Sequence, residues 1–487
     1  MAAAVFELNG QSISVDDVDP HCTLLEWLRA SGRTGSKEGC AEGECGACAV
    51  AFLSRDEQGR PRYEPVNSCL VSLPEVHGRS MVTVEGVCPS SAAGRPQAQP
   101  PGALHPVQEA MVRTGGSQCG YCTPGFVVSL FCEYYRPDRN GYDPEAISGN
   151  LCRCTGYRPI ADAARGMGTP AANDPWLIPL GKGPRELPSL EYAAQGQRFF
   201  RPTSTVELAR ILWENPGAVL LGGGTDLMVY ANQRHTRYAV LVSLGAIAEL
   251  NSWNVSETEI ALGAAVPLER IERLVEHSPW GTELGALRQL LRLFSSRLIR
   301  NRATLGGNLA TASPIGDAAP VLIALGAELT LQTGGGQRRV PLAEFFHGYR
   351  ETLLAPGEWI ASVHLRRPLP RIQRFYKVSK RVLDDISTVA AAFALDLAPD
   401  GSVERLGAAY GGIAATPLRA GTLERLALGK PWRSEATLRL LLDAVRGIGT
   451  PLSDQRGSAA YRGAMVEKLL ERFHAETNAQ LGAEAAE

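Results

Sequence analysis

Apolar and polar residues alternate at both ends of the first 88 residues. The runs Val5-Phe-Glu-Leu and Met81-Val-Thr-Val have the two-residue period of strands. Between them, Leu24 to Ala30 has the spacing of a helix. This order of strand, helix and strand predicts a small domain with a β-grasp-like pattern over residues 1–88.

A helical region is predicted next, over residues 89–165. It opens with a stretch rich in Pro, Ala and Gln, Ser90 to Gly102, which is typical of a linker. Beyond this stretch the apolar spacing predicts helices at Val107 to Val112, Phe126 to Tyr135 and Ile160 to Ala164.

The remaining two thirds of the chain mix strand and helix patterns. Gly166 to Leu187 carries four prolines and little periodicity, so we expect an extended segment within a linker at 166–195. From Phe199 onward both periods recur, without an internal repeat. These mixed patterns predict further domains in this part, so the expected fold class is α+β with several domains.

Composition narrows the classes of function. A length of 487 residues suits about three or four domains. The net charge is −2, and no polybasic tract indicates nucleic acid binding. No apolar run reaches membrane length, and the N-terminus lacks the basic and apolar regions of a secretory signal. We therefore expect a cytoplasmic protein that binds neither membrane nor nucleic acid.

All eleven cysteines lie before residue 155, and four of them form a recognisable tetrad. Cys40, Cys45 and Cys48 have the C-x4-C-x2-C spacing of a plant-type [2Fe-2S] centre, with Cys69 as the fourth ligand. A loop around such a cluster needs unusual φ angles and N–H groups directed at sulfur, and Gly39, Gly43 and Gly46 meet that need.

A second tetrad combines Cys119-Gly-Tyr-Cys122 with Cys152-Arg-Cys154. Pro124 and Pro159 follow at positions where helices could begin, so these thiolates are predicted to come from loops at helix N-termini. The helix dipole stabilises negative charge at such ends. A C-x-C pair is too tight for most zinc ribbons, so this tetrad also favours an iron–sulfur cluster.

Structural zinc, disulfides and a chance clustering of small residues are the alternatives. Zinc tolerates C-x2-C but does not account for the first tetrad's spacing. Disulfides require an oxidising compartment, whereas cysteine clusters in cytosolic proteins are usually metal sites. Cys22, Cys88 and Cys132 belong to neither tetrad, and we expect them to be ordinary small buried residues.

Two glycine-bearing stretches occur in the cysteine-free part, Leu220 to Leu227 and Thr304 to Asp317. Consecutive N–H groups without β-carbons can bind phosphate oxygens, although such loops are equally often tight turns. Neither stretch has the G-x-G-x-x-G spacing of a Rossmann site. Downstream of two iron–sulfur tetrads, a flavin is the natural electron partner.

A charged run, Phe375 to Ile386, contains basic residues followed by Asp384 and Asp385. By itself it is typical of a solvated loop that enters the strand-like segment Ser387 to Leu395.

The order of these motifs resembles the xanthine dehydrogenase family of molybdenum hydroxylases. The resemblance rests on Glu38 to Cys48, Gln118 to Gly125, Gly149 to Tyr157 and the two glycine stretches, and it spans nearly the whole sequence. More narrowly, the chain is similar to the bacterial small subunit, whose molybdenum domain sits on another chain. This family implies a β-grasp ferredoxin-like domain, a four-helix [2Fe-2S] domain, a vanillyl-alcohol-oxidase-type FAD domain at 196–370 and a C-terminal α/β domain at 371–487.

The resemblance also implies roles for individual residues. The cluster ligands are Cys40, Cys45, Cys48 and Cys69, then Cys119, Cys122, Cys152 and Cys154. Gln118 would contact the pterin of the molybdenum cofactor, and Asp384 would lie near NAD; a polar residue at a helix start is the alternative for Gln118. The FAD contacts would be Leu220, Leu221, Gly222, Gly223, Gly224, Thr225, Asp226, Leu227, Phe294, Thr304, Leu305, Gly306, Gly307, Asn308, Asp317, Ile360 and Lys377.

The implied function is electron transfer within a xanthine dehydrogenase. A partner molybdenum subunit, in a heterotetramer with two of each chain, would convert hypoxanthine to xanthine and urate, and this chain would pass the electrons through two [2Fe-2S] clusters and FAD to NAD+. We expect the chain to be too short for a molybdenum-binding half. A related aldehyde or aromatic-CoA oxidoreductase, a stand-alone electron carrier and a zinc-stabilised scaffold remain as alternatives.

The sequence departs from the family pattern at two places. Val382 and Leu383 interrupt the charged run, and Gly-Gly-Gly-Thr-Asp replaces the Gly-Asn-Thr-Glu of some relatives.

Overall fold

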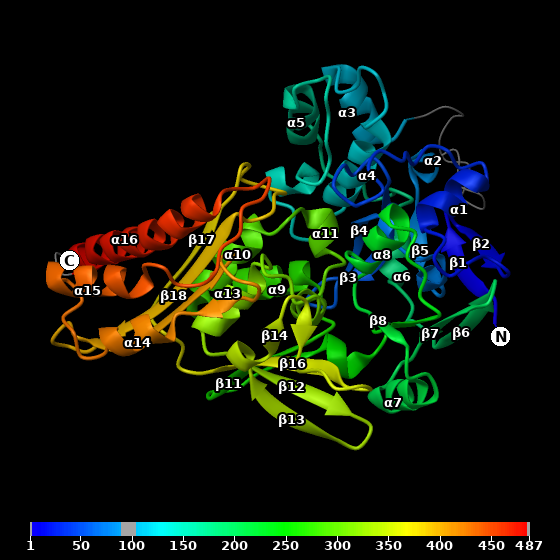
Figure 1. The fold of residues 1–487 in the computed structure, drawn as a ribbon. Coiled ribbons are helices and arrows are strands. Elements are labelled where there is room, and N and C mark those ends of the chain that lie inside the picture. The colour runs from blue at the N-terminus through cyan, green and yellow to red at the C-terminus, as the bar shows by residue number, and fades with distance from the viewer. Residues whose placement is uncertain (1, 89–103, 485–487) are drawn as a thin grey trace. The chain divides into compact units, whose positions relative to one another are not determined.

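The computed structural model describes residues 2–88 and 104–484 (Figure 1). The chain divides into two compact units. The first comprises residues 1–248 with 295–303, and the second comprises 249–294 with 304–487. The predicted linker from Ser90 to Gly102 lies outside the described residues.

The first unit begins with a five-stranded sheet in the order β2-β1-β5-β3-β4. Its strands are β1 (Ala4–Leu8), β2 (Gln11–Val15), β3 (Ala49–Arg55), β4 (Pro61–Asn67) and β5 (Ser80–Val82). Helix α1 (Leu24–Ala30) starts at a capping box of Thr23 and Glu26 and buries three leucines. The predicted strand at Val5 to Leu8 and the predicted helix are therefore confirmed. The strand predicted at Met81 to Val84 is wrong for its second half, because β5 ends at Val82 and Val84 begins the next helix.

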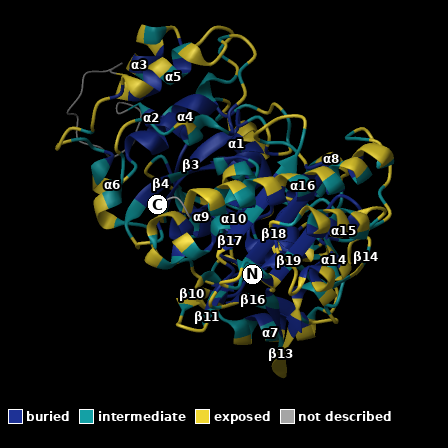
Figure 2. Cartoon of the chain, turned by 90° about the vertical axis from the view of Figure 1, so that its left-hand side faces the viewer, coloured by how far each residue is buried: buried dark blue, intermediate teal, exposed yellow. Residues whose placement is uncertain are grey.

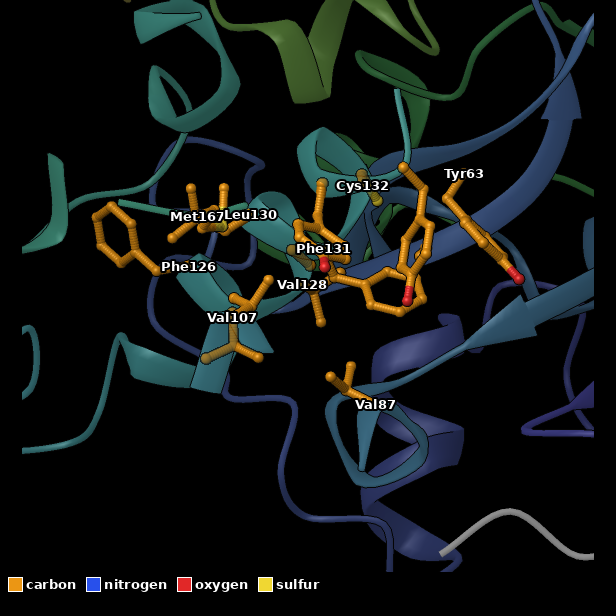
Figure 3. Packing of buried hydrophobic residues seen from close by; sticks show 14 of the residues in the cluster. Tyr63, Val87, Val107, Phe126, Val128, Leu130, Phe131, Cys132 and Met167 are labelled. Atoms are coloured by element: carbon orange, nitrogen blue, oxygen red, sulfur yellow. The ribbon is translucent and has the colours of Figure 1, made fainter. Parts of the chain in front are cut away.

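A helical region follows in the same unit. Its helices are α2 (Val84–Val87), α3 (Pro106–Thr114), α4 (Thr123–Tyr134) and α5 (Arg158–Arg165). Helix α4 is central, because every residue from 125 to 134 is buried. Figure 3 shows Val128 and Phe131 of this helix in a cluster that also contains Tyr63 of β4. The three predicted helices are confirmed.

The prediction of an extended segment from Gly166 to Leu187 is wrong in part, because it contains the short helix α6 (Leu177–Lys182). Trp176, next to this helix, is only 1% exposed. Its indole N–H donates to the Val87 carbonyl (3.3 Å), and its own carbonyl accepts the Tyr63 hydroxyl (3.0 Å). Burial of the Trp176 side chain holds this segment in place. The proline content of the segment does not predict this burial.

The first unit also contains a four-stranded sheet in the order β6-β7-β9-β8. Its elements are β6 (Leu190–Ala194), β7 (Gln197–Arg201), α7 (Thr205–Glu214), β8 (Val219–Leu221), α8 (Leu227–Gln233) and β9 (Val240–Ser243). Strands β7, β9 and β8 are parallel. The first glycine stretch therefore emerges at the carboxyl end of β8, where ligands commonly bind in parallel sheets. Helix α11 (Arg297–Arg300) belongs to this unit as well.

The second unit opens with a five-stranded antiparallel sheet in the order β10-β11-β16-β12-β13. The strands are β10 (Trp253–Val255), β11 (Glu259–Gly263), β12 (Glu328–Thr333), β13 (Gly336–Pro341) and β16 (Trp359–Arg366). The helices are α9 (Leu268–His277), α10 (Gly285–Leu293), α12 (Leu305–Ala310) and α13 (Ala318–Ala324), and the strands of a small hairpin are β14 (Phe346–Gly348) and β15 (Glu351–Thr352).

A second sheet of this unit has the order β17-β18-β19-β20. Its strands and helices are β17 (Ile372–Val378), β18 (Val389–Leu397), β19 (Val403–Gly411), β20 (Leu418–Arg419), α14 (Gly421–Ala427), α15 (Glu435–Val445) and α16 (Ala459–Glu484). Phe393 of β18 stacks on Phe473 of α16 with ring centroids 4.7 Å apart. The predicted strand from Ser387 to Leu395 is confirmed as β18.

The sheets contain buried strands, and the helices carry exposed residues. Figure 2 shows buried strands β3 and β18 and exposed residues along α3 and α16. Among the described residues, no helix combines the length and apolar character required to cross a lipid bilayer.

Phe131→Ala tests the packing of the helical region. The ring is fully buried and meets Trp176 edge-on at 5.0 Å, so its removal should cost about 3–5 kcal/mol. Urea unfolding followed by tryptophan fluorescence measures the loss. Val112→Ala, at an α3 position that is 71% exposed, should change stability by less than about 0.5 kcal/mol. Equal losses in the two variants would contradict this core.

Candidate functional site

The first cysteine tetrad comes together in the first unit. Cys48 and Cys69 are buried, with their Sγ atoms 3.4 Å apart. Cys40 and Cys45 are half-buried, and their thiols are hydrogen-bonded to each other. Cys69 lies in a 3₁₀ turn that follows β4, and the other three lie in the loop before β3. The four thiols therefore form two pairs.

Glycines permit the close turns of this loop. Gly43 and Gly46 have φ angles of +86° and +65°, which residues with a side chain rarely adopt. A β-carbon at Gly39 would lie 2.8 Å from Cys45 Sγ. The expected unusual φ angles are therefore present at Gly43 and Gly46, whereas Gly39 serves a close approach to Cys45 and has no positive φ.

Backbone N–H groups compensate negative charge on the first tetrad. The pKa of Cys40 is lowered to about 5, because its sulfur accepts a hydrogen bond from the Cys45 thiol and further bonds from the N–H groups of Glu42, Glu44 and Cys45. The pKa of Cys69 is raised, because its thiol is hydrogen-bonded to Cys48 and is buried, and the Gly43 N–H acts in the opposite direction by favouring the ionised form. Such N–H to sulfur bonds are what a loop around an anionic cluster requires.

The second tetrad comes together at a more exposed position. Cys119 and Cys154 are exposed and form one hydrogen-bonded pair, and the half-buried Cys122 and Cys152 form the other. The Tyr121 N–H and the Cys154 thiol lower the pKa of Cys119. Cys122 is the N-cap residue of α4, and Pro124 and Pro159 lie in the first turns of α4 and α5, as predicted.

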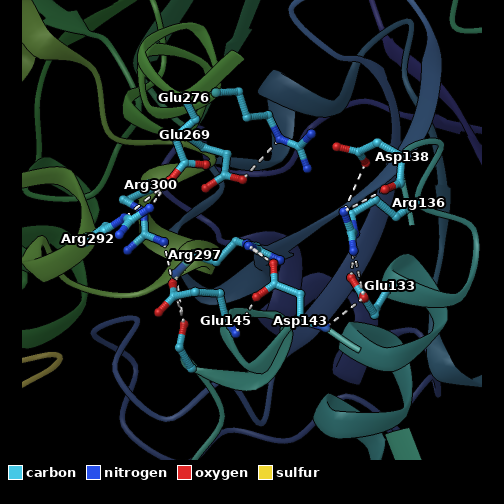
Figure 4. A network of polar contacts seen from close by, with 12 residues as sticks. Glu133, Arg136, Asp138, Asp143, Glu145, Glu269, Glu276, Arg292, Arg297 and Arg300 are labelled. Carbon is cyan, nitrogen blue, oxygen red and sulfur yellow. Dashed lines mark hydrogen bonds and ion pairs between the residues drawn. The ribbon is translucent and has the colours of Figure 1, made fainter. Parts of the chain in front are cut away.

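Ion pairs hold the segment that leads to Cys152 (Figure 4). Arg297 pairs with Asp143 at 2.5 Å, and Arg300 pairs with Glu145 at 2.6 Å. Although burial alone would raise the pKa of Asp143, the Arg297 guanidinium lowers it below the ordinary value. Both arginine side chains are largely buried, so these contacts fix the segment against α11.

The two ligand loops touch each other. The Leu151 N–H, one residue before Cys152, donates to the Cys45 carbonyl at 3.0 Å. The Asn150 amide donates to the Gly46 carbonyl at 3.1 Å. A β-carbon at Gly46 would lie 2.2 Å from the Gly149 carbonyl, so only glycine allows this approach.

The arrangement of the thiols fits binuclear iron. In a [2Fe-2S] centre each iron takes two thiolates, and each tetrad presents two pairs. A structural zinc ion needs its four donors around one point. Within the described ranges, no three His, Cys, Asp or Glu side chains are arranged around one such point.

The first glycine stretch lies in the first unit, between β8 and α8. Arg302 lines this loop: its guanidinium donates to the Gly223 carbonyl at 3.3 Å and pairs with Glu75 at 2.7 Å. A β-carbon at Gly223 would lie 1.7 Å from the Arg302 carbonyl. Gly224 has a φ of +80° and lies against the Leu70 carbonyl. The remaining residues of the stretch are Leu220, Leu221, Gly222, Thr225, Asp226 and Leu227.

The second glycine stretch lies in the second unit. Thr304 is the N-cap residue of α12, and its hydroxyl accepts the Gly307 N–H at 3.1 Å. Gly306 packs on Ala264, where a β-carbon would meet the Ala264 β-carbon at 2.5 Å. The side-chain oxygen of Asn308 is buried and has no hydrogen-bond partner. It can therefore accept a hydrogen bond from a ligand such as a flavin nucleotide.

A buried ion pair lies in the same unit. Lys377 Nζ is 3.0 Å from Asp317 Oδ2 and donates to the Leu293 carbonyl at 3.1 Å, beside Phe294. The Ser387 hydroxyl donates to the other Asp317 oxygen at 2.5 Å. The structure thus places Lys377 in contact with Asp317 and with Leu293, the residue before Phe294.

Ile360 and Asp384, which the resemblance assigned to contacts with FAD and NAD, also lie in the second unit. Ile360 is buried on β16, next to Ala361, whose carbonyl accepts the Ala264 N–H. Asp384 lies with a φ of +51° in the loop between β17 and β18, and its carbonyl accepts a hydrogen bond from Arg381. The expectation that the whole charged run is a loop is wrong for Phe375 to Val378, which belong to β17.

Gln118 is exposed in the loop before Cys119 and not at a helix start, because α4 begins only at Thr123. Of the three remaining cysteines, Cys132 is buried as expected, whereas Cys22 and Cys88 are only half-buried.

Sequence reasoning missed the residues that hold the first glycine loop. Glu75 accepts hydrogen bonds from Arg302 and from Ser243 at the end of β9. Arg79, beside them, is half-buried, and its pKa is lowered to about 10 by desolvation and by the nearby Arg302. These residues are far apart in the chain and match no motif, so no spacing could have revealed them.

Four family models match the chain. They are the 2Fe-2S iron–sulfur cluster binding domain over residues 6–73, the [2Fe-2S] binding domain over 83–165, the FAD binding domain in molybdopterin dehydrogenase over 193–368, and the CO dehydrogenase flavoprotein C-terminal domain over 374–477. The chain therefore has two [2Fe-2S]-binding domains and an FAD-binding domain. The expected fold class, α+β with several domains, is confirmed.

Relatives of known activity extend these matches. A xanthine dehydrogenase from Emericella nidulans is 32% identical over 99% of this chain, but the chain spans only 39% of that protein. The carbon monoxide dehydrogenase structure from Hydrogenophaga pseudoflava has a TM-score of 0.52 and 27% identity, covering 56% of this chain and 94% of the other. Quinoline 2-oxidoreductase from Pseudomonas putida 86 has a TM-score of 0.52 and 25% identity, covering 57% and 94%.

Gly223→Val tests the first glycine loop. The added β-carbon would collide with the Arg302 carbonyl, so the loop must open and FAD should be lost while both iron chromophores stay. Flavin fluorescence after acid extraction, compared with visible absorption, measures the two separately. Gly217→Ala is the matched control, because a β-carbon there meets no atom within 4 Å. Full retention of FAD by Gly223→Val would contradict the role of this loop.

Proposed function

We propose a function from the premise that this chain is the iron–sulfur and flavin portion of a molybdenum hydroxylase. It is the electron-transfer subunit of a xanthine dehydrogenase: electrons from the hydroxylation of hypoxanthine to xanthine and urate, at a partner molybdenum subunit, pass through two [2Fe-2S] clusters and FAD to NAD+. The similarity to xanthine dehydrogenase over 99% of this chain supports this choice.

The eight tetrad thiols are the proposed metal ligands. Cys40, Cys45, Cys48 and Cys69 hold the buried cluster, and Cys119, Cys122, Cys152 and Cys154 hold the exposed one. Backbone N–H groups face the first set and stabilise its negative charge. These residues supply arrangement and tuning of potential, and they transfer no proton.

The contact between the two ligand loops is the observation that carries the proposal. The bond from the Leu151 N–H to the Cys45 carbonyl joins residues that adjoin a ligand of each tetrad. Electron transfer between centres needs such a short connection. The greater exposure of Cys119 and Cys154 suits the tetrad that would face a partner subunit, and exposed Gln118 beside them suits contact with a pterin.

The flavin contacts are proposed for the glycine stretches and for the buried pair of Asp317 and Lys377. The unpartnered side-chain oxygen of Asn308 and the side-chain-free surface at Gly223 and Gly224 support this assignment. Asp384, in the exposed loop between β17 and β18, is proposed to influence access of NAD+.

The proposed domains are 1–88 and 89–165 for the two clusters, 166–195 as the linker, 196–370 for FAD and 371–487 as the C-terminal flavoprotein domain. The proposed assembly has two copies of this chain and two of a molybdenum-binding subunit. We place it in the cytoplasm, because eight reduced thiols serve as ligands there.

A second function is the same role in another molybdenum hydroxylase. The similarity to the carbon monoxide dehydrogenase and quinoline 2-oxidoreductase structures favours it, since these relatives act on other substrates. Steady-state assays with a purified large subunit separate the two, because substrate choice belongs to that partner. A stand-alone carrier would instead be a stable monomer without affinity for a molybdenum subunit.

Cofactor content is the first test of the proposal. Protein purified without oxygen should contain about four irons and one FAD per chain, because two binuclear centres and one flavin site are proposed. Iron and acid-labile sulfide analysis and flavin extraction measure this. A colourless protein with bound zinc would overturn the assignment.

Cys154→Ser tests the order of the two clusters. The variant should lose electron transfer from the molybdenum partner, because Cys154 belongs to the exposed tetrad, and should keep NADH oxidation by artificial dyes. Both rates are measured on the assembled enzyme. Cys88→Ser, outside both tetrads, is the control and should keep both rates. Equal loss of the two rates in Cys154→Ser would reverse the proposed order.

A further inference from the structure

Helix α8 links the first glycine loop to the first cysteine tetrad. At its start, the Met228 N–H donates to the Gly224 carbonyl at 3.0 Å, and Gly224 lies against the Leu70 carbonyl. Along its length, Met228 and Ala231 are buried in one cluster with Cys48 and Cys69. The helix therefore shares one buried cluster with two of the tetrad's cysteines.

At its end, α8 binds the backbone of the ligand loop. The Asn232 side-chain amide donates to the carbonyls of Ala41 and Cys69, both at 2.8 Å. The amide nitrogen carries two hydrogens, so both bonds form at once. The Gln233 side-chain amide donates to the Cys40 carbonyl at 2.9 Å. These two side chains thus bind three carbonyls, and two of those belong to tetrad cysteines.

The bond to the Ala41 carbonyl also fixes the N–H group on the other side of the same peptide. In a planar trans peptide the carbonyl and the following N–H point in opposite directions. Asn232 binds the Ala41 carbonyl, and the N–H of that peptide, which belongs to Glu42, donates to Cys40 sulfur. The amide of Asn232 therefore holds this N–H toward the sulfur.

Ala41 needs such support. Its φ is +55°, in the left-handed region that an alanine populates only at a cost of about 1–2 kcal/mol. Strained residues of this kind persist where their surroundings hold them. Without the bond from Asn232 the peptide is free to turn, and the Glu42 N–H would leave the sulfur.

We propose that Asn232 and Gln233 are positioning residues that raise the reduction potential of the [2Fe-2S] centre assigned to Cys40, Cys45, Cys48 and Cys69. An N–H directed at sulfur stabilises the additional negative charge of the reduced state, so its loss lowers the potential. The inference rests on the proposed function, since it presumes a cluster at this tetrad. The same helix carries the first glycine loop, so the loop and the tuned tetrad share one support.

The test is an EPR-monitored redox titration of the whole chain, with Asn232→Leu compared with the wild type. The signal of the first cluster is identified by its loss in Cys45→Ser. At the wild-type midpoint potential, the ratio of reduced to oxidised first cluster should fall about tenfold in Asn232→Leu, which corresponds to about 59 mV for one electron. The second cluster is an internal reference and should not shift.

Two further variants separate tuning from general damage. Gln233→Leu removes one bond from an exposed side chain, so a smaller shift in the same direction is expected. Asn215→Leu is the matched control, because Asn215 also donates its amide to a carbonyl, that of Ile211, and accepts a bond from Arg198, yet it lies at the C-cap of α7. It should leave both potentials unchanged.

An unchanged first-cluster potential in Asn232→Leu, or equal shifts of both clusters, would overturn the inference. If Asn232→Leu loses the first cluster's iron, Gln233→Leu decides: a lowered potential supports the positioning role and an unchanged one refutes it. A wild-type protein without any binuclear iron signal would refute the proposed function itself, which is a separate outcome.

Discussion

Buried sulfur can carry negative charge only where hydrogen-bond donors face it, and this requirement shapes the region around the first tetrad. Cys48 and Cys69 are 2% exposed, so water cannot solvate their thiolates. Backbone N–H groups face Cys69 and the neighbouring Cys40, in a loop that adopts left-handed conformations at Ala41, Gly43 and Gly46. The carbonyls of such a loop then point outward and need donors of their own.

Those outward carbonyls explain which segments surround the loop. Leu151 and Asn150, next to the second tetrad, donate to the carbonyls of Cys45 and Gly46. Asn232, on the helix that follows the first glycine stretch, donates to Ala41 and Cys69. The donors that keep the ligand loop in shape are thus supplied by the two neighbours with which it would exchange electrons. The same hydrogen bonds thus hold the loop in shape and join it to both neighbours.

The sequence predicts the parts of this arrangement that depend on local spacing. The cysteine spacing indicates both tetrads, and apolar periodicity predicts α1, α3, α4 and α5, because ligand loops and amphipathic helices are local patterns. It does not predict α6, because this helix depends on burial of Trp176 against two distant residues. Tyr63 is over a hundred residues away from Trp176 in the chain, and Val87 is about ninety residues away. Nor does the sequence predict Asn232, Arg302 or Glu75, because a side-chain contact to a distant carbonyl or carboxylate leaves no periodic trace.

The spin–spin interaction between the two reduced centres tests the contact of the ligand loops most directly. Low-temperature EPR of the fully reduced chain should give signals that are mutually split or broadened, and the splitting should vanish when only one centre is reduced. Two binuclear signals that are identical in the half-reduced and fully reduced states would contradict the contact between the two tetrads.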